Sequence, residues 1–314
     1  MRLARLYLGP RVQPWNDGLN QFGYYSWSEV YDSFRLYNQP RSPSSIIMPP
    51  FEVRDIPGKG RGLIAKIDIP AGARILWEKP LLLANPIASE DLEATVAAKV
   101  KALSKSQQQQ FLSLHNNFPG HETIRAIRPI KAGEEITINY DEGGPSNVRR
   151  PMLKKSFGFD CACSLCTLPP SQLQASDDRR VRIQQLDASI RDSLATAIDP
   201  KGSLKSCLSL LYTLEEEYGA CSVQHSARVY YYAFQICIAH GDVDRATTFA
   251  ERSYRAKVIC GGEDNVETLR LKTLVLQPTT HSSYGALSMR WKTDREESFS
   301  GYNTVEFEKW LFRQ

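Results

Sequence analysis

The sequence contains no long apolar run. A membrane-spanning helix needs about 18 consecutive apolar residues, and no stretch of this chain approaches that length. The opening segment MRLARLYLGPR carries basic residues, but its apolar part is too short and too interrupted for a secretory signal. A transmembrane protein is therefore excluded, and we expect an intracellular protein in the nucleus, the cytoplasm or both.

A strong charge of one sign is also lacking. The chain has 39 Lys and Arg residues against 35 Asp and Glu residues, which leaves a net charge of +4. So small an excess does not indicate nucleic acid as a partner. One basic cluster could face nucleic acid, but clusters of this kind are more often solvated surface. It comprises Arg149, Arg150, Lys154 and Lys155.

The composition is that of an ordered globular protein. Apolar residues make up 42% and charged residues 24% of the 314 residues. This is enough material for a core, so a wholly disordered chain is excluded. At roughly 100–200 residues per domain, the length allows about two domains.

The seven cysteines are an odd number in a chain that shows no secretory signal. This usage indicates a reducing compartment and free thiols. Four of them are scattered through sequence with a helical pattern, where a cysteine usually serves as a small buried apolar residue. These four are Cys207, Cys221, Cys237 and Cys260.

The other three cysteines crowd together as Cys161-Ala162-Cys163-Ser164-Leu165-Cys166. Zinc takes four tetrahedral ligands, often thiolates, so this spacing suits a zinc site whose fourth ligand comes from a distant residue. Three unrelated thiols are the alternative interpretation. A disulfide is a poorer one, because cysteines this close bridge only with strain.

The chain divides into four segments by local pattern. Residues 1–48 show no period, which predicts a poorly ordered extension. Residues 49–145 have the pattern of strands and turns, interrupted at about 91–114 by an apolar stripe with helical spacing. A cysteine-bearing segment follows at 146–175. Apolar stripes of helical spacing then fill residues 176–314, where paired helices with small residues at contact points suggest tetratricopeptide-like stacking.

Two parts of the strand region repeat one pattern. Each consists of a strand, an x-Ala-Gly turn and a second strand, with the glycine supplying the turn geometry. We predict two hairpins of one design that are neighbours in one sheet. At the end of the second, Ile136, Ile138 and Tyr140 are predicted to share one face of a strand. The matching positions are Ala65, Ile69, Ala71, Gly72 and Ile75 in the first part and Ala126, Ile130, Ala132, Gly133 and Ile136 in the second.

The segment Gly58-Lys59-Gly60-Arg61-Gly62 satisfies a relaxed dinucleotide-binding pattern. That pattern needs a helix after the glycines, whereas the following LIAKIDI is typical of a strand, so a dinucleotide site is disfavoured. A plain hairpin loop is one interpretation. In the other, the backbone approaches a ligand closely while Lys59 and Arg61 reach its carboxylate.

Taken in order, the glycine-rich segment, the strand AGEEITINY and the segment FGFDCACSLC resemble a SET domain followed by its post-SET segment. The resemblance covers residues 51–83 and 121–170. It is strongest to the fungal members of the SMYD-like branch, whose C-terminal half is also helical. The implied fold is α+β, with a truncated SET-type all-β hairpin core, a post-SET zinc segment and a C-terminal helical tetratricopeptide-like domain.

SET enzymes are protein lysine methyltransferases that use S-adenosylmethionine. By this resemblance, Tyr140 is the catalytic tyrosine and borders the cofactor, and Phe159 stacks on its adenine. The methionine end of the cofactor would be held by Lys59, Gly60, Arg61 and Gly62.

The resemblance also implies a zinc ion and a protein substrate. The post-SET zinc ligands would be Cys161, Cys163 and Cys166. The substrate lysine must be neutral when it attacks, and a narrow apolar channel lowers the pKa of its amine by penalising the ammonium form. A fixed tyrosine hydroxyl can orient the amine for an in-line displacement, which depends on positioning more than on acid chemistry.

The chain departs from the family at one place. The family has an Asn-His-Ser-Cys motif before the second hairpin, and this motif is absent here, as are several strands expected between Gly120 and His121. The missing residues would contact the cofactor, supply the fourth zinc ligand and form a wall of the substrate channel. A mis-spliced gene model and a genuine degenerate homologue account equally well for the sequence. The zinc-binding MYND finger is also absent, so no partner is expected through it.

Two functions fit these features. The first is an S-adenosylmethionine-dependent protein lysine methyltransferase of SET type, impaired in this 314-residue form. The alternative is an interaction protein that keeps a relict SET core and binds a partner in the groove of its helical half. An Asn-His-x-Cys stretch would discriminate between them, and its absence lowers the expected activity.

Overall fold

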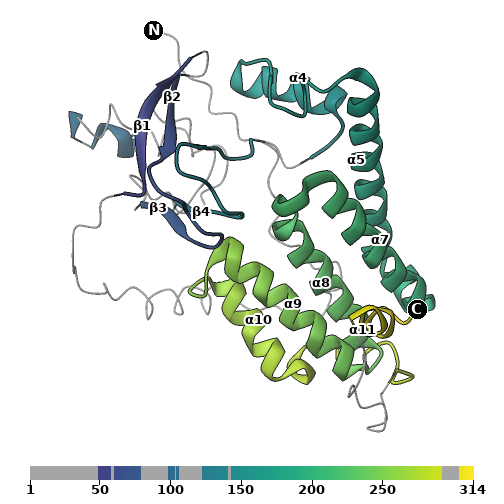
Figure 1. The fold of residues 1–314 in the computed structure, drawn as a ribbon. Coiled ribbons are helices and arrows are strands. Elements are labelled where there is room, and N and C mark those ends of the chain that lie inside the picture. Colours follow the sequence, from purple (N-terminus) through teal and green to yellow (C-terminus); the bar gives the residue numbers. More distant parts are fainter. Residues whose placement is uncertain are drawn as a thin grey trace.

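The computed structural model describes residues 49–57, 60–78, 98–102, 104–105, 122–140, 143–291 and 304–314. The predicted extension over residues 1–48 and the predicted ligand Lys59 lie outside these ranges. Most of the predicted helical insert at 91–114 does too, although residues 98–101 are helical. Strands lie in the first half of the described chain and helices in the second (Figure 1), so the mixed α+β class is confirmed.

Five strands form two small sheets. One sheet has the order β1-β2-β5 and the other pairs β3 with β4, all antiparallel. The strands are β1 (Phe51–Ile56), β2 (Gly60–Ala65), β3 (Arg74–Glu78), β4 (Glu122–Arg125) and β5 (Glu135–Ile136).

The two repeated parts pair with each other rather than folding as two hairpins. The first contributes β2 and β3, which pair with β5 and β4 of the second. Between these pairs, Ile69 and Ile130 exchange backbone hydrogen bonds of 2.8 and 2.9 Å. The two parts are neighbours, as predicted, but they do not form two hairpins of one sheet, since their strand pairs belong to two sheets. A turn signal marks where the chain turns and not which strand it pairs with.

Equivalent positions of the two parts form one core. The turn glycines Gly72 and Gly133 have φ angles of 81° and 84°, where a side chain would be strained. The buried residues of this core are the repeated apolar positions themselves: Ala65, Ile69, Ile75, Ala126, Ile130 and Ile136.

The predicted strand up to Tyr140 is shorter than expected. β5 ends at Ile136, which is buried, whereas Ile138 and Tyr140 are 50% and 53% exposed. The alternation of apolar and polar residues is a local signal, but a strand also needs a partner. The pairing of β2 with β5 covers only Leu63 and Ile64 of β2.

From Ser146 on, the described elements are helices. The elements are α4 (Ser146–Phe157), α5 (Pro170–Ile190), α6 (Ser193–Ile198), α7 (Pro200–Tyr218), the 3-10 turn η1 (Gly219–Cys221), α8 (Val223–Ala239), α9 (Val243–Gly261), α10 (Val266–Leu276), the 3-10 turn η2 (Pro278–Thr280) and α11 (Thr304–Leu311).

A large apolar core joins α5 and α7–α11, with Phe234, Phe249 and Leu204 among its fully buried side chains. Cys207 and Cys237 are buried in it, as expected of small apolar residues, whereas Cys221 and Cys260 are only partly buried. Among the described residues, no helix is both long enough and apolar enough to cross a membrane.

The strand region docks on the helical region at the turn between α9 and α10 (Figure 1). Arg125 at the end of β4 donates to the Gly72 carbonyl at 3.0 Å and to Asp264 in that turn at 3.1 Å. Arg74 forms a further ion pair with Asp264. Gly262 adopts φ 88°, which favours glycine, and an added Cβ would lie 2.1 Å from the Arg125 guanidinium and displace it.

Candidate cofactor and zinc site

The structure brings two of the predicted site residues together in an aromatic cluster. The rings of Tyr140 and Phe159 meet edge to face, with centroids 5.5 Å apart. Phe157, at the end of α4, completes the cluster 5.0 Å from Tyr140. Gly158 separates the two phenylalanines and adopts φ 77°, which ends α4 and turns Phe159 back toward Tyr140. A surface of aromatic faces of this kind can stack on a flat heterocycle.

The described part of the glycine-rich segment, residues 60–62, begins β2, which pairs with β1. Gly60 pairs with Ile56 and adopts φ 80°, a conformation that favours glycine. A Cβ on Gly62 would lie 2.3 Å from the Ile56 side chain, so this glycine also has a packing role. Because Gly60–Ala65 is a strand, the helix that a dinucleotide site needs is absent from this segment, as predicted.

The hairpin and the aromatic cluster are connected through β5. The antiparallel pairing of Leu63 with Ile136 means that the chain leaves β5 toward the Gly60 end of β2, and Tyr140 follows four residues later. The exposed side chain of Arg61 lies near that same end. The sheet therefore directs both predicted cofactor-binding parts to one end.

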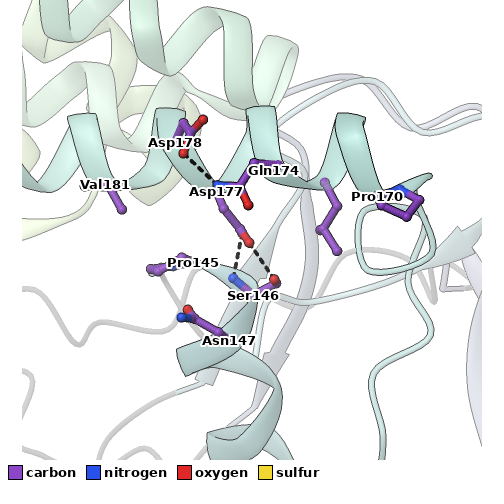
Figure 2. A pocket seen from close by; sticks show the side chains of 9 residues that line it. Pro145, Ser146, Asn147, Pro170, Gln174, Asp177, Asp178 and Val181 are labelled. Carbon is purple, nitrogen blue, oxygen red and sulfur yellow. Dashed lines mark hydrogen bonds between the residues drawn. The ribbon is translucent and has the colours of Figure 1, made fainter.

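Helix α4 links the aromatic cluster to the cysteines and is held by a cap from another helix. Pro145 precedes it and provides no side-chain cap. Instead Asp177 of α5 accepts hydrogen bonds from the Ser146 backbone N–H and from its hydroxyl, both at 2.6 Å (Figure 2). A cleft of about 410 Å³ opens beside this contact; its lining includes Pro170, Gln174 and Val181.

The three predicted zinc ligands also come together. Their sulfur atoms all lie within 4.8 Å of one another. Cys161 and Cys166 are buried against Leu153 of α4, whereas Cys163 is exposed. Three converging thiols fit three of the four positions around a tetrahedral zinc ion.

A guanidinium group faces the three sulfurs. Arg149 Nη1 lies 3.7 Å from Cys161 Sγ, 3.8 Å from Cys163 Sγ and 3.1 Å from Cys166 Sγ. The sequence did not predict this contact. It places Arg149 in a basic cluster of a kind that is more often solvated surface. Its side chain is instead partly buried.

The cysteines differ in their ease of ionisation. Burial tends to raise the pKa of Cys163, but hydrogen bonds from the Cys166 backbone, the neighbouring thiols and Arg149 outweigh it and lower the pKa to about 6. Burial, with hydrogen bonding to the other two sulfurs, raises the pKa of Cys166 to about 11. Burial would lower the pKa of Arg149, yet the three sulfurs raise it overall. The cluster therefore holds a thiolate next to a permanent cation at neutral pH.

Comparison with known proteins identifies the class of this chain. Residues 60–141, which include β2, β5 and Tyr140, match the family model of the SET domain. This part of the chain therefore resembles a SET domain in its sequence, as the motifs indicated.

Two relatives illustrate the likeness. Histone-lysine N-methyltransferase set5 of Schizosaccharomyces pombe is 27% identical over 283 aligned positions, which cover 74% of this chain and 85% of that protein. A SET domain-containing protein of Dictyostelium discoideum is 43% identical over 49 residues, 15% of this chain and 12% of that protein. The first alignment is longer than the part of this chain that it covers, so the yeast protein has residues within the match that this chain lacks.

Proposed function

We propose that this chain is a SET-type protein lysine methyltransferase that uses S-adenosylmethionine. The observation that carries the proposal is the SET match over residues 60–141, which includes both the glycine-bearing strand and Tyr140. The likeness to a yeast enzyme named for its action on histone lysine supports a lysine side chain of a protein as the substrate. A SMYD-like subtype, a tetratricopeptide-like helical half and an intracellular location are parts of the same proposal.

In this proposal each residue has a defined task. Tyr140 orients the attacking amine through its hydroxyl, and its ring face attracts a cationic centre. Phe159 stacks on the adenine of the cofactor. Gly60 and Gly62 allow close approach of the backbone to the methionine end, whose carboxylate Arg61 can reach. Lys59, which lies outside the described residues, is proposed for the same carboxylate.

We further propose that the site is incomplete in the 314-residue form. The Asn-His-Ser-Cys motif of the family is absent from the sequence. Tyr140 is 53% exposed, whereas a tyrosine in a narrow substrate channel would be largely covered. A misplacement of about 1 Å can lower a rate on the order of a hundredfold, so the loss of contacts on one side of the site should lower it at least as much.

The alternative function is a non-catalytic interaction protein. The exposure of Tyr140 favours it, as does a helical half with an apolar core of its own. A partner would then bind in the groove of the helical half, and the SET region would serve as a scaffold.

The test is transfer of a labelled methyl group to mixed cellular protein. We would compare the 314-residue chain with a chimera that carries, between Gly120 and His121, the corresponding segment of the yeast set5 protein. The chimera is expected to methylate lysine, and the 314-residue chain to transfer about a hundredth as much or less. Tyr140→Phe in the chimera should remove about 99% of its activity, whereas Tyr212→Phe, at an exposed position of α7, should leave it unchanged.

Two results would contradict the proposal. A folded chimera that methylates no lysine would favour the interaction protein. Tyr140-dependent methylation by the 314-residue chain at the rate of the chimera would show that the site is complete without the inserted segment.

A further inference from the structure

A nitrogen atom of Arg149 lies close to the position that a fourth zinc ligand would occupy beside the three cysteines. In a tetrahedral zinc site with Zn–S bonds of ~2.3 Å, the donor atoms lie ~3.8 Å from one another. Arg149 Nη1 lies 3.7, 3.8 and 3.1 Å from the sulfurs of Cys161, Cys163 and Cys166. The nitrogen atom thus matches this distance for Cys161 and Cys163 and lies closer to Cys166, so it is near the fourth corner of the tetrahedron.

The placement of this nitrogen is supported by the packing of α4. Arg149 is in the first turn of that helix, which Asp177 caps through Ser146. One turn further on, Leu153 is fully buried against Cys161 and Cys166. The backbone that carries Arg149 is therefore tied to the cysteines on one side and to α5 on the other.

A guanidinium at this corner has a chemical consequence. It has only N–H donors and stays protonated in proteins, so it cannot be a zinc ligand. It can donate to thiolate sulfurs, and its positive charge repels a divalent cation a few ångströms away. The guanidinium and zinc would therefore compete for the same three sulfur atoms.

We propose that Arg149 is the resident cationic partner of Cys161, Cys163 and Cys166, and that it opposes zinc binding by this cluster. The proposal concerns the metal site alone and does not depend on methyltransferase activity. It differs from the usual outer hydrogen bond of a basic residue to one zinc-bound sulfur. Such a bond would make Arg149 strengthen zinc binding, so the two roles predict effects of opposite sign.

The test is the zinc affinity of the full 314-residue chain, measured at pH 7 by competition with a chromophoric chelator in the presence of a non-thiol reductant. Arg149→Gln removes the charge and keeps a long side chain, and it should bind zinc about tenfold more tightly or better. Arg149→Lys keeps the charge and should stay within about threefold of the unmodified chain. Arg150→Gln, at the exposed neighbouring position, is the matched control and should bind as the unmodified chain does.

If a variant loses stability, thermal melting with and without zinc still tests the proposal. Metal-free Arg149→Gln should melt at a lower temperature than the unmodified chain, because its thiols lose their cationic partner, and zinc should raise its melting temperature more. Unchanged or weaker zinc binding by Arg149→Gln would overturn the proposal. So would a variant that is unfolded without zinc and is not refolded by it.

Discussion

Single side chains connect distant parts of this sequence. Arg149 contacts sulfur atoms 12 to 17 positions later in the chain, and Asp177 caps a helix that starts 31 positions earlier. The sequence identified the cysteines, because their spacing is a local pattern. It could not identify Arg149 or Asp177, because their roles depend on how α4 lies against its neighbours.

His281 is a further residue whose role depends on the fold. Its Nδ1 accepts a hydrogen bond from the Ser283 backbone N–H at 3.2 Å, which leaves the proton on Nε2, 3.3 Å from the Tyr231 hydroxyl. The ring also packs edge to face against Phe234. Burial, and secondarily the charge of Arg270, lowers its pKa from 6.5 to about 4.

We predict that the folded protein loses stability in mild acid through His281. Between pH 6.5 and about 4 the unfolded chain binds a proton on this histidine and the folded chain does not. The free energy of unfolding should therefore fall as pH is lowered through this window, by on the order of 2 kcal/mol from this group. Urea unfolding of the unmodified chain and of His281→Gln at pH 7 and pH 5 measures the effect. An equal decrease in both proteins would assign the acid sensitivity to other groups.

At the scale of elements, the strands show the limit of local patterns. The repeated apolar positions and the Ala-Gly turns were identified from the sequence, and these apolar positions are the buried ones. The pairing of the strands was not identified, because β2 pairs with β5 and β3 pairs with β4 across a long insertion. The helices were easier to predict, since the 3.6-residue period is complete within each. Within residues 176–314, where helical stripes were expected, α10 spans Val266–Leu276.

The contribution of the α4 cap to stability can be tested directly. Asp177→Ala leaves the first turn of α4 without its acceptor, since Pro145 offers none. We predict a loss of about 1–2 kcal/mol in the free energy of unfolding. Asp178→Ala is the matched control, because Asp178 is exposed and accepts a hydrogen bond from Gln174 of the same helix. Equal stability of the two variants in urea unfolding would show that the cap contributes nothing.

At the scale of the whole molecule, the helical region has a core of its own and α5 belongs to it. The carboxylate of Glu217 on α7 is fully buried and accepts from Ser176 at 2.6 Å and from Arg180 at 2.7 Å. Both partners lie on α5, which begins at Pro170, before the predicted boundary of the helical domain at residue 176. A domain boundary at residue 169 would leave the whole of α5 in the helical domain.

We predict that the fragment of residues 169–314 folds by itself with a cooperative melt. The fragment of residues 191–314 lacks α5, so it loses Ile183, Leu186 and Ile190 from the helical core and exposes the apolar surface that they cover. It should melt at a much lower temperature or not fold. Circular dichroism melting of the two fragments measures this. A 169–314 fragment without a cooperative transition would show that the helical region depends on the strand region.

The central claim is that the chain has the scaffold of a SET methyltransferase with an incomplete cofactor site. The most direct test is calorimetric titration of S-adenosylmethionine into the 314-residue chain and into the chimera with the inserted segment. We predict a dissociation constant of roughly 100 μM or weaker for the chain and binding at least tenfold tighter for the chimera. Phe159→Ala should weaken binding by the chimera by about tenfold, the usual contribution of one aromatic stack on a base. Micromolar binding by the 314-residue chain, or no gain in a folded chimera, would contradict the claim.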